Sequence, residues 1–185
     1  MHSTRTREGL QEILRETCEE EVADRITSSV QWGHFTVAGM LDFIFEIEGV
    51  SRVLSHQLVR HRMAWFLQQT QRSTDPTHVD PISPPSVIET GMENEYSQHW
   101  NKTRALYHSL VEKGVPIEDA RYVLPNATQT RLVMKIDGSN LIHFLKLRLD
   151  RHAQWEIREL AHQIHNLVKK VCPNLFSEKL NEYWW

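Results

Sequence analysis

One polar stretch, residues 57–73, concentrates the side chains that are best suited to binding an anion. Arg60, His61 and Arg62 are adjacent, and on a helix consecutive side chains point about 100° apart, so burial on one core face cannot explain all three. Arginine offers a rigid fork of donors that fits phosphate or carboxylate, and residues 68–72 add further donors. The stretch predicts a site for an anionic ligand; a solvated basic helix end followed by a polar loop is the alternative.

The composition of the chain restricts any such ligand to a local site. The chain has 185 residues, which predicts a single domain over 1–185, and 21 Lys+Arg against 24 Asp+Glu give a formal net charge of -3. No general positive field therefore recruits a nucleic-acid polymer or an anionic membrane. Cys18 and Cys172 lack metal-ligand spacing. This cysteine pattern argues for a reducing compartment and against a disulfide framework, so we expect a cytoplasmic protein. No run approaches the roughly 18 apolar residues of a membrane span.

The elements that must position these residues follow from the apolar pattern. Gly49 is expected to end the first strand, Asp137 and Gly138 to form a turn, and Ser139 or Asn140 to cap the helix that follows. The proline-rich segment 75–85 reads as a surface excursion. The pattern predicts strands over 40–48 and 128–136, and helices over 7–27, 50–59, 87–113, 116–125, 141–149 and 153–171.

Three segments, taken together, resemble the motifs of a known family. They are residues 48–62, which end in Arg-His-Arg, residues 118–126 around Arg121, and residues 144–161, which contain Arg148. In this order and spacing the chain resembles the flavin-dependent thymidylate synthase family, whose signature is Arg-His-Arg, seven residues and then Ser. The resemblance covers about residues 33–176.

This resemblance implies a fold, a reaction and a set of site residues. The fold would be a mixed α+β domain with an antiparallel sheet flanked by long helices, assembled as a homotetramer with shared active sites. The reaction would be reductive C5 methylation of a uridine monophosphate with FAD, NADPH and methylenetetrahydrofolate. By match, the flavin would contact Arg60, His61, Arg62, His143 and His152. The nucleotide would contact Gln57, Gln68, Thr70, Gln71, Arg72, Arg121 and Arg148, with Arg148 and Thr70 as the catalytic residues.

The residue types agree with that chemistry. C5 of a uracil is a poor nucleophile, and the classical route adds a cysteine thiolate to C6; neither Cys18 nor Cys172 lies in the three segments. A flavin-hydride route without cysteine fits better. Arg148 could stabilise negative charge developing on the pyrimidine, while Arg72 and Arg121 would meet the phosphate. His162 and His165 lie three apart without an obvious third ligand, so no metal is expected.

Several positions depart from the family pattern and bear on the substrate. Thr70 stands where the family has Ser, Ser73 where Tyr is usual and Gln68 where Glu is common; Gly39-Met40 replaces a Glu-His pair, and His143 replaces an Asn. Ser73 in place of Tyr would open volume, and its hydroxyl could satisfy a ribose 2′-OH. We therefore expect UMP to be favoured, giving 5-methyl-UMP for nucleoside-antibiotic biosynthesis. The alternatives are a thymidylate synthase acting on dUMP, or a non-catalytic homologue that binds flavin or nucleotide.

Overall fold

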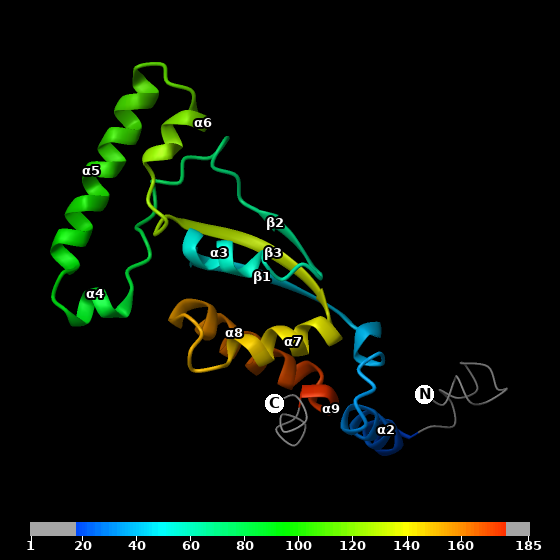
Figure 1. Cartoon of the computed structure of the whole chain (residues 1–185). Coiled ribbons are helices and arrows are strands. Elements are labelled where there is room, and N and C mark those ends of the chain that lie inside the picture. The colour runs from blue at the N-terminus through cyan, green and yellow to red at the C-terminus, as the bar shows by residue number, and fades with distance from the viewer. Residues whose placement is uncertain (1–17, 177–185) are drawn as a thin grey trace. The chain divides into compact units, whose positions relative to one another are not determined.

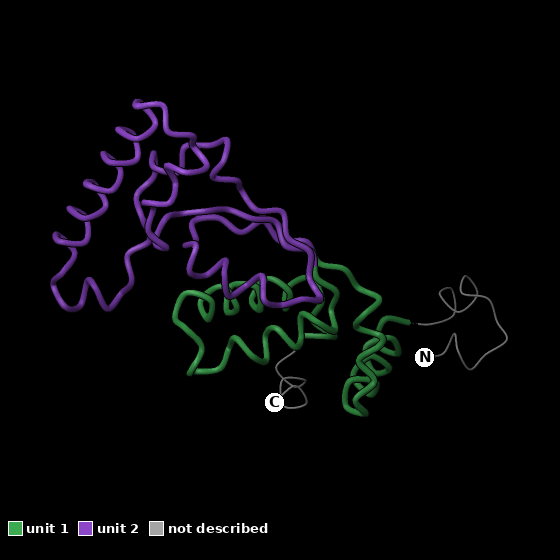
Figure 2. Tube along the Cα trace, turned by 45° about the horizontal axis from the view of Figure 1, so that its top comes forward, with its two compact units in different colours: residues 1–43, 136–185 green, residues 44–135 purple. Residues whose placement is uncertain are grey.

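The protein is a mixed α+β chain, as predicted, and it divides into two compact units. The computed structural model describes residues 18–176. The first unit comprises residues 1–43 and 136–185, and the second comprises residues 44–135 (Figure 2). The prediction that 1–185 acts as one domain stays a prediction. Within residues 18–176 no helix is both long and apolar enough to cross a membrane.

Most of a three-stranded antiparallel sheet lies in the second unit (Figure 1). Its strands are β1 (Asp42–Ser51), β2 (Ala64–Gln68) and β3 (Gln129–Asp137), in the order β1-β3-β2. Just beyond β1, the amide of Arg52 donates to the carbonyl of Thr128 and the next amide, that of Val53, donates to Asn126. The partner's number falls as the first number rises, as antiparallel pairing requires. The predicted antiparallel sheet is thus confirmed.

Strand β3 follows the alternation that its sequence predicts. Thr130, Leu132, Met134 and Ile136 are buried, whereas Gln129, Arg131, Val133 and Lys135 are at least partly exposed. One buried face and one open face is the usual state of an antiparallel sheet. The predicted strand 128–136 is therefore confirmed within one residue at each end.

Strand β1 does not end at Gly49, as was predicted, but continues to Ser51. Gly49 has a φ of +65°, which a residue without Cβ adopts at little cost. The buried positions step from Ile47 to Val50 across it, so the glycine shifts the alternation by one residue, as a bulge does. Ser51 then caps α3 (Arg52–Leu58), its hydroxyl accepting from the amide of Leu54 at 3.1 Å. Helix α3 consequently begins two residues later than predicted and ends before the Arg-His-Arg run.

The predicted long helix over 87–113 is two helices. These are α4 (Pro85–Glu89) and α5 (Glu93–Glu112). Between them Gly91 has a φ of +72°, a left-handed conformation that ends a helix. Gly114, with a φ of +83°, ends α5 in the same way, as predicted. The predicted short helix over 116–125 is confirmed as α6 (Ile117–Ala120) followed by the 3-10 helix η3 (Arg121–Val123).

The first unit is helical around an apolar core. It contains α2 (Glu19–Gln31), η2 (Ala38–Met40), α7 (Gly138–Arg148), α8 (Trp155–Val171) and α9 (Pro173–Phe176). Helix α8 packs against α7 and α9, and the buried side chains of these helices include Phe144, Ile157, Ile164, Val168 and Phe176. The predicted helices over 141–149 and 153–171 are confirmed. Of the predicted helix 7–27, residues 7–17 lie outside the described residues.

The predicted turn at Asp137 and Gly138 is wrong, because this pair starts α7. The Asp137 carboxylate accepts from the amide of Asn140 at 3.0 Å, so Asp137 is the N-cap rather than Ser139 or Asn140. Gly138 is the first helical residue, and a Cβ there would lie 2.5 Å from the carbonyl oxygen of Ala38. The glycine is therefore required by a close approach between two backbone segments.

Candidate functional site

The last residue of β2 and the loop after it carry four of the predicted nucleotide-binding residues, and β3 holds the first part of this segment in place. The side-chain amide of Gln68 donates to the hydroxyl of Thr130 at 3.3 Å. The amide of Gln69 donates to the carbonyl of Arg131 at 2.9 Å. The Thr70 hydroxyl accepts from the amide of Arg72 at 3.0 Å. The loop thus begins as a continuation of the sheet and then turns back on itself.

The structure brings Arg72 and Arg121 together around Glu118. A guanidinium nitrogen of Arg72 (Nη2) lies 3.2 Å from the carboxylate of Glu118, and Nε of Arg121 donates to the carbonyl of Glu118 at 3.0 Å. The side chains of Arg72 and Glu118 are 67% and 55% exposed, and such a pair contributes little free energy. An incoming anion can therefore replace Glu118 on Arg72 at small cost. This pairing fits the predicted phosphate role of both arginines.

Arg52 is a residue of this cluster to which the sequence motifs assigned no role. Its Nη2 donates to the carbonyl of Gln69 at 2.9 Å. Burial lowers the pKa of its guanidinium, and the positive charge of Arg121 lowers this pKa further. A sequence signal did exist, because a cation in the first turn of a helix is electrostatically unfavourable and calls for an explanation.

Arg60, His61 and Arg62 lie in the turn between α3 and β2. The amides of Arg60 and His61 donate to the carbonyls of Gln57 and Leu58 at 3.3 and 3.1 Å, and the carbonyl of His61 accepts from the amide of Ala64 at 3.2 Å. Arg60 and Arg62 are exposed, while His61 and Gln57 are half-buried. The run thus follows the helix, as predicted, and the turn leaves Arg60 and Arg62 exposed while His61 is half-buried.

The remaining predicted residues, His143, Arg148 and His152, belong to the first unit. Arg148 is the last residue of α7, and with His152 it lines a cavity of about 500 Å³. Asp150 fixes His152, accepting from its amide at 2.8 Å and lying 2.9 Å from its Nδ1. These two hydrogen bonds lower the pKa of Asp150. His143 is exposed on α7 and is not among the residues that line this cavity.

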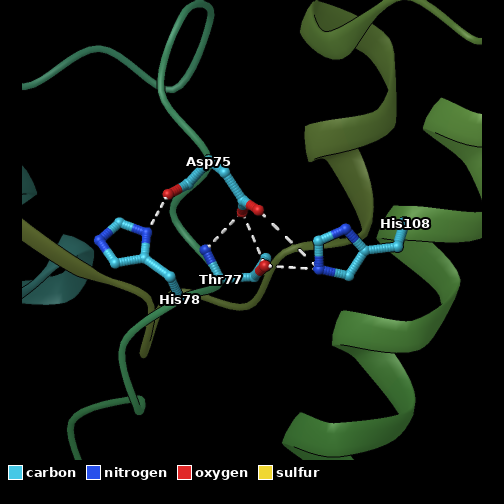
Figure 3. Close-up of polar contacts among 4 residues, drawn as sticks. All are labelled: Asp75, Thr77, His78 and His108. Atoms are coloured by element: carbon cyan, nitrogen blue, oxygen red, sulfur yellow. Dashed lines mark hydrogen bonds and ion pairs between the residues drawn. The ribbon is translucent and has the colours of Figure 1, made fainter.

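The proline-rich segment 75–85, predicted as a surface excursion, is anchored at its start to α5 (Figure 3). The Asp75 carboxylate accepts from the amide and the hydroxyl of Thr77 at 2.8 and 2.7 Å. Nε2 of His108, on α5, lies 3.0 Å from that hydroxyl and 3.9 Å from the carboxylate. Thr77 is fully buried. His78 lines a cavity of about 360 Å³ together with Gln69 and other residues.

The Asp75 anchor makes part of the stability of the second unit depend on pH. Burial raises the pKa of Asp75, but the hydrogen bonds from Thr77 and the charges of His108 and His78 outweigh burial, so the pKa lies below its ordinary value of 3.8. A carboxyl whose pKa is lowered by folding stabilises above the unfolded pKa, and this contribution disappears as the pH falls through the folded value.

We expect Asp75→Asn to reveal this contribution, because the amide keeps an acceptor for Thr77 but cannot ionise. The free energy of unfolding of the wild type should exceed that of the variant at pH 5. This difference should shrink as the pH falls below 3.8. Urea unfolding at pH 3, 4 and 5 measures it, and equal differences at all three values would contradict the assignment.

Comparisons with known proteins agree on one family. The family model described as "Thymidylate synthase complementing protein" matches residues 2–174. A "Flavin-dependent thymidylate synthase" of Sulfolobus acidocaldarius is 40% identical over 179 residues, which is 94% of this chain and 67% of the relative. Relatives of the same name from Geobacter sulfurreducens and Clostridium tetani are 39% and 36% identical; the matches cover 92% and 91% of this chain, and 75% of each relative.

Proposed function

The chain belongs to the thymidylate synthase complementing protein family, and we propose that it is a flavin-dependent thymidylate synthase that methylates C5 of dUMP to give dTMP. The cofactor in this proposal is FAD, with NADPH and methylenetetrahydrofolate as co-substrates. The observation that carries it is the meeting of Arg72 and Arg121 around Glu118, beside the loop held by Gln69. Arg72 lies on an exchangeable carboxylate and Arg121 on the backbone carbonyl of the same residue, and two guanidinium groups at one place suit the phosphate of a nucleotide.

The expected preference for UMP gains no support. The relatives are named as thymidylate synthases, and Ser73 is an exposed residue of the loop. The expected role in antibiotic biosynthesis gains no support either. We therefore favour dUMP and treat UMP as the competing outcome of the experiment.

Different residues of the chain would bind the phosphate, contact the nucleotide and stabilise charge during the reaction. Arg72 and Arg121 would bind the phosphate, while Gln68 and Thr70 would lie along the nucleotide. Arg148 would donate hydrogen bonds to a pyrimidine carbonyl, where negative charge develops during reaction at C5. Its position beside a cavity, half-buried at the end of α7, suits a fixed donor. Cys18 is exposed and burial raises the pKa of the Cys172 thiol, which makes Cys172 a poor nucleophile.

The donor set fits a flavin dinucleotide. Arg60 and Arg62 are exposed cations on one turn, as the pyrophosphate of such a cofactor requires. His152 keeps a fixed orientation through Asp150, so it can serve as an oriented polar contact. FAD supplies the hydride and electron chemistry when bound. The chain has to hold the cofactor, orient it and keep water away.

We also propose that the protein works as a homotetramer, in the cytoplasm. The open face of the sheet exposes Ile44, Trp65 and Leu67, which are 70%, 63% and 76% exposed. The same face carries Glu46, Glu48, Arg131 and Lys135, so both signs of charge border the apolar residues. Such a surface suits contact with a second copy of the chain. Light scattering tests the assembly, and a stable monomer with full activity would contradict it.

Methyl-product formation from dUMP and from UMP, measured side by side, tests the main proposal. FAD-loaded protein is mixed with NADPH and methylenetetrahydrofolate in excess, and the reaction without methylenetetrahydrofolate is the control. A higher kcat/KM for dUMP supports the proposal, whereas a higher value for UMP overturns the choice of substrate. Bound FAD without turnover of either nucleotide would identify a non-catalytic homologue.

A further inference from the structure

We propose that Arg52 is a positioning residue of the nucleotide site, which fixes the 68–72 loop by holding the carbonyl of Gln69. This inference rests on the proposed function, because the loop matters only if it binds the nucleotide. It adds a residue outside those assigned by the family motifs. The evidence is the set of contacts around Gln69 and the cost at which Arg52 is kept in place.

The peptide groups of Gln69 are held from two sides. Its amide donates to the carbonyl of Arg131 on β3, and its carbonyl accepts from Nη2 of Arg52, both at 2.9 Å. Gln69 separates Gln68 from Thr70, and the hydroxyl of Thr70 accepts from the amide of Arg72. The strand and Arg52 thus fix the point from which the rest of the loop projects.

Keeping Arg52 in this position costs free energy, and the fold itself does not require an arginine here. Its Nε is buried and makes no hydrogen bond within the part of the chain that the structure describes, and an unsatisfied buried donor costs free energy. Its charge also faces that of Arg121. Helix α3 already has its N-cap in Ser51, so an uncharged residue at 52 would leave the cap intact. The hydrogen bond to Gln69 is what an uncharged aliphatic residue would lose.

The same contacts indicate that Arg52 acts on the nucleotide site through the residues around it. Nε is closed to solvent and Nη2 is engaged by Gln69, so most of the guanidinium is directed into the protein. Its charge lies near Arg121, which contacts Glu118, the partner of Arg72. Arg52 therefore holds the loop through a hydrogen bond, and its charge acts on that of Arg121.

The test compares Arg52→Gln and Arg52→Lys with the wild type. Arg104→Gln is the matched control, because Arg104 lies on α5 of the same unit and contacts Asn101 of the same helix. Hydrogen exchange of the amides in residues 68–72 and the steady-state constants for dUMP are measured, together with thermal unfolding by circular dichroism. These readouts separate a local effect on the loop from a general loss of stability.

We expect Arg52→Gln to raise the KM for dUMP by about tenfold or more, the effect of losing a hydrogen bond from a charged group, with a much smaller change in kcat. Exchange in 68–72 should quicken while the midpoint of unfolding stays close to that of the wild type. For Arg52→Lys, which keeps the charge and one donor group, the KM and the exchange rate of 68–72 should lie between those of the wild type and those of Arg52→Gln. Arg104→Gln should match the wild type.

An Arg52→Gln protein with the KM and the loop exchange of Arg104→Gln would overturn the inference. A fall in kcat at unchanged KM would also overturn it, because it would place Arg52 in the chemical step. If Arg52→Gln does not fold, Arg52→Lys decides by the same two readouts. If the wild type methylates no uridylate, the proposed function fails, and loop exchange still reports whether Arg52 holds Gln69.

Discussion

Arg148→Ala is expected to lower kcat by about 100- to 1,000-fold, the usual effect of removing one donor that stabilises charge in a transition state. Arg148 ends α7 and lines the cavity that His152 also lines. Alanine is a good helix former, and the side chain of Arg148 is only half-buried. The loss should therefore fall on turnover rather than on folding.

Single-turnover rates, flavin absorbance and the midpoint of thermal unfolding separate these effects. Bound FAD should remain, because Arg148 is not among the residues expected to hold the flavin. Arg25→Ala is the control, since Arg25 is a partly exposed arginine of the same unit that pairs with Glu21. Turnover by Arg148→Ala equal to that of Arg25→Ala would remove Arg148 from the site.

Gly138→Ala is expected to destabilise the first unit by roughly 1–3 kcal/mol, the range for forcing extra atoms into a packed region. The added Cβ would lie 2.5 Å from the carbonyl oxygen of Ala38 and 3.3 Å from its carbon. Because these atoms belong to the backbone, relief requires η2 or the start of α7 to move. Alanine would otherwise favour a helix at this position.

The chain contains a matched control for this substitution. At Gly39, one residue from the carbonyl in question, a Cβ would lie 3.8 Å from its nearest neighbour, which is an ordinary contact. Gly39→Ala should therefore change the free energy of unfolding much less. Urea unfolding followed by circular dichroism compares the two variants, and equal stabilities would show that the close approach relaxes without cost.

The sequence predicted the elements whose side chains repeat with a clear period. Strand β3 alternates buried and exposed residues along its whole length, and α8 keeps one apolar face until Pro173 stops it. Strand β2 was missed, because it has only five residues and its exposed positions are occupied by Trp65 and Leu67. Apolar residues on an open face remove the alternation by which a strand is recognised.

The errors at glycines have a common physical cause. Gly49 was expected to stop β1 and Gly138 to form a turn. Instead, Gly49 lies in a continuing strand, and Gly138 makes room for the carbonyl of Ala38, which is distant in the sequence. Both uses depend on what lies opposite the glycine. A sequence shows that a position tolerates unusual backbone but not which neighbour demands it.

For the site residues too, the sequence identified side chains but not the contacts between them. Arg72 and Arg121 were named from motifs, and the structure supplies what motifs do not contain, namely their meeting at Glu118. Arg52 was missed because its partner is the backbone carbonyl of Gln69, and every residue type presents the same carbonyl. The unfavourable cation in the first turn of α3 was the sequence signal for Arg52, but the identity of its partner could not be read from the sequence.

Glu118 gives the loop a resident counter-ion that a ligand must replace. An anion that takes Arg72 from Glu118 exchanges one negative partner for another, so the guanidinium is never left bare. The measured affinity is then a difference between two anions rather than the strength of one, as in any competition. A doubly charged phosphate, which accepts several hydrogen bonds, therefore competes with Glu118 for Arg72 better than a weakly held anion such as chloride does.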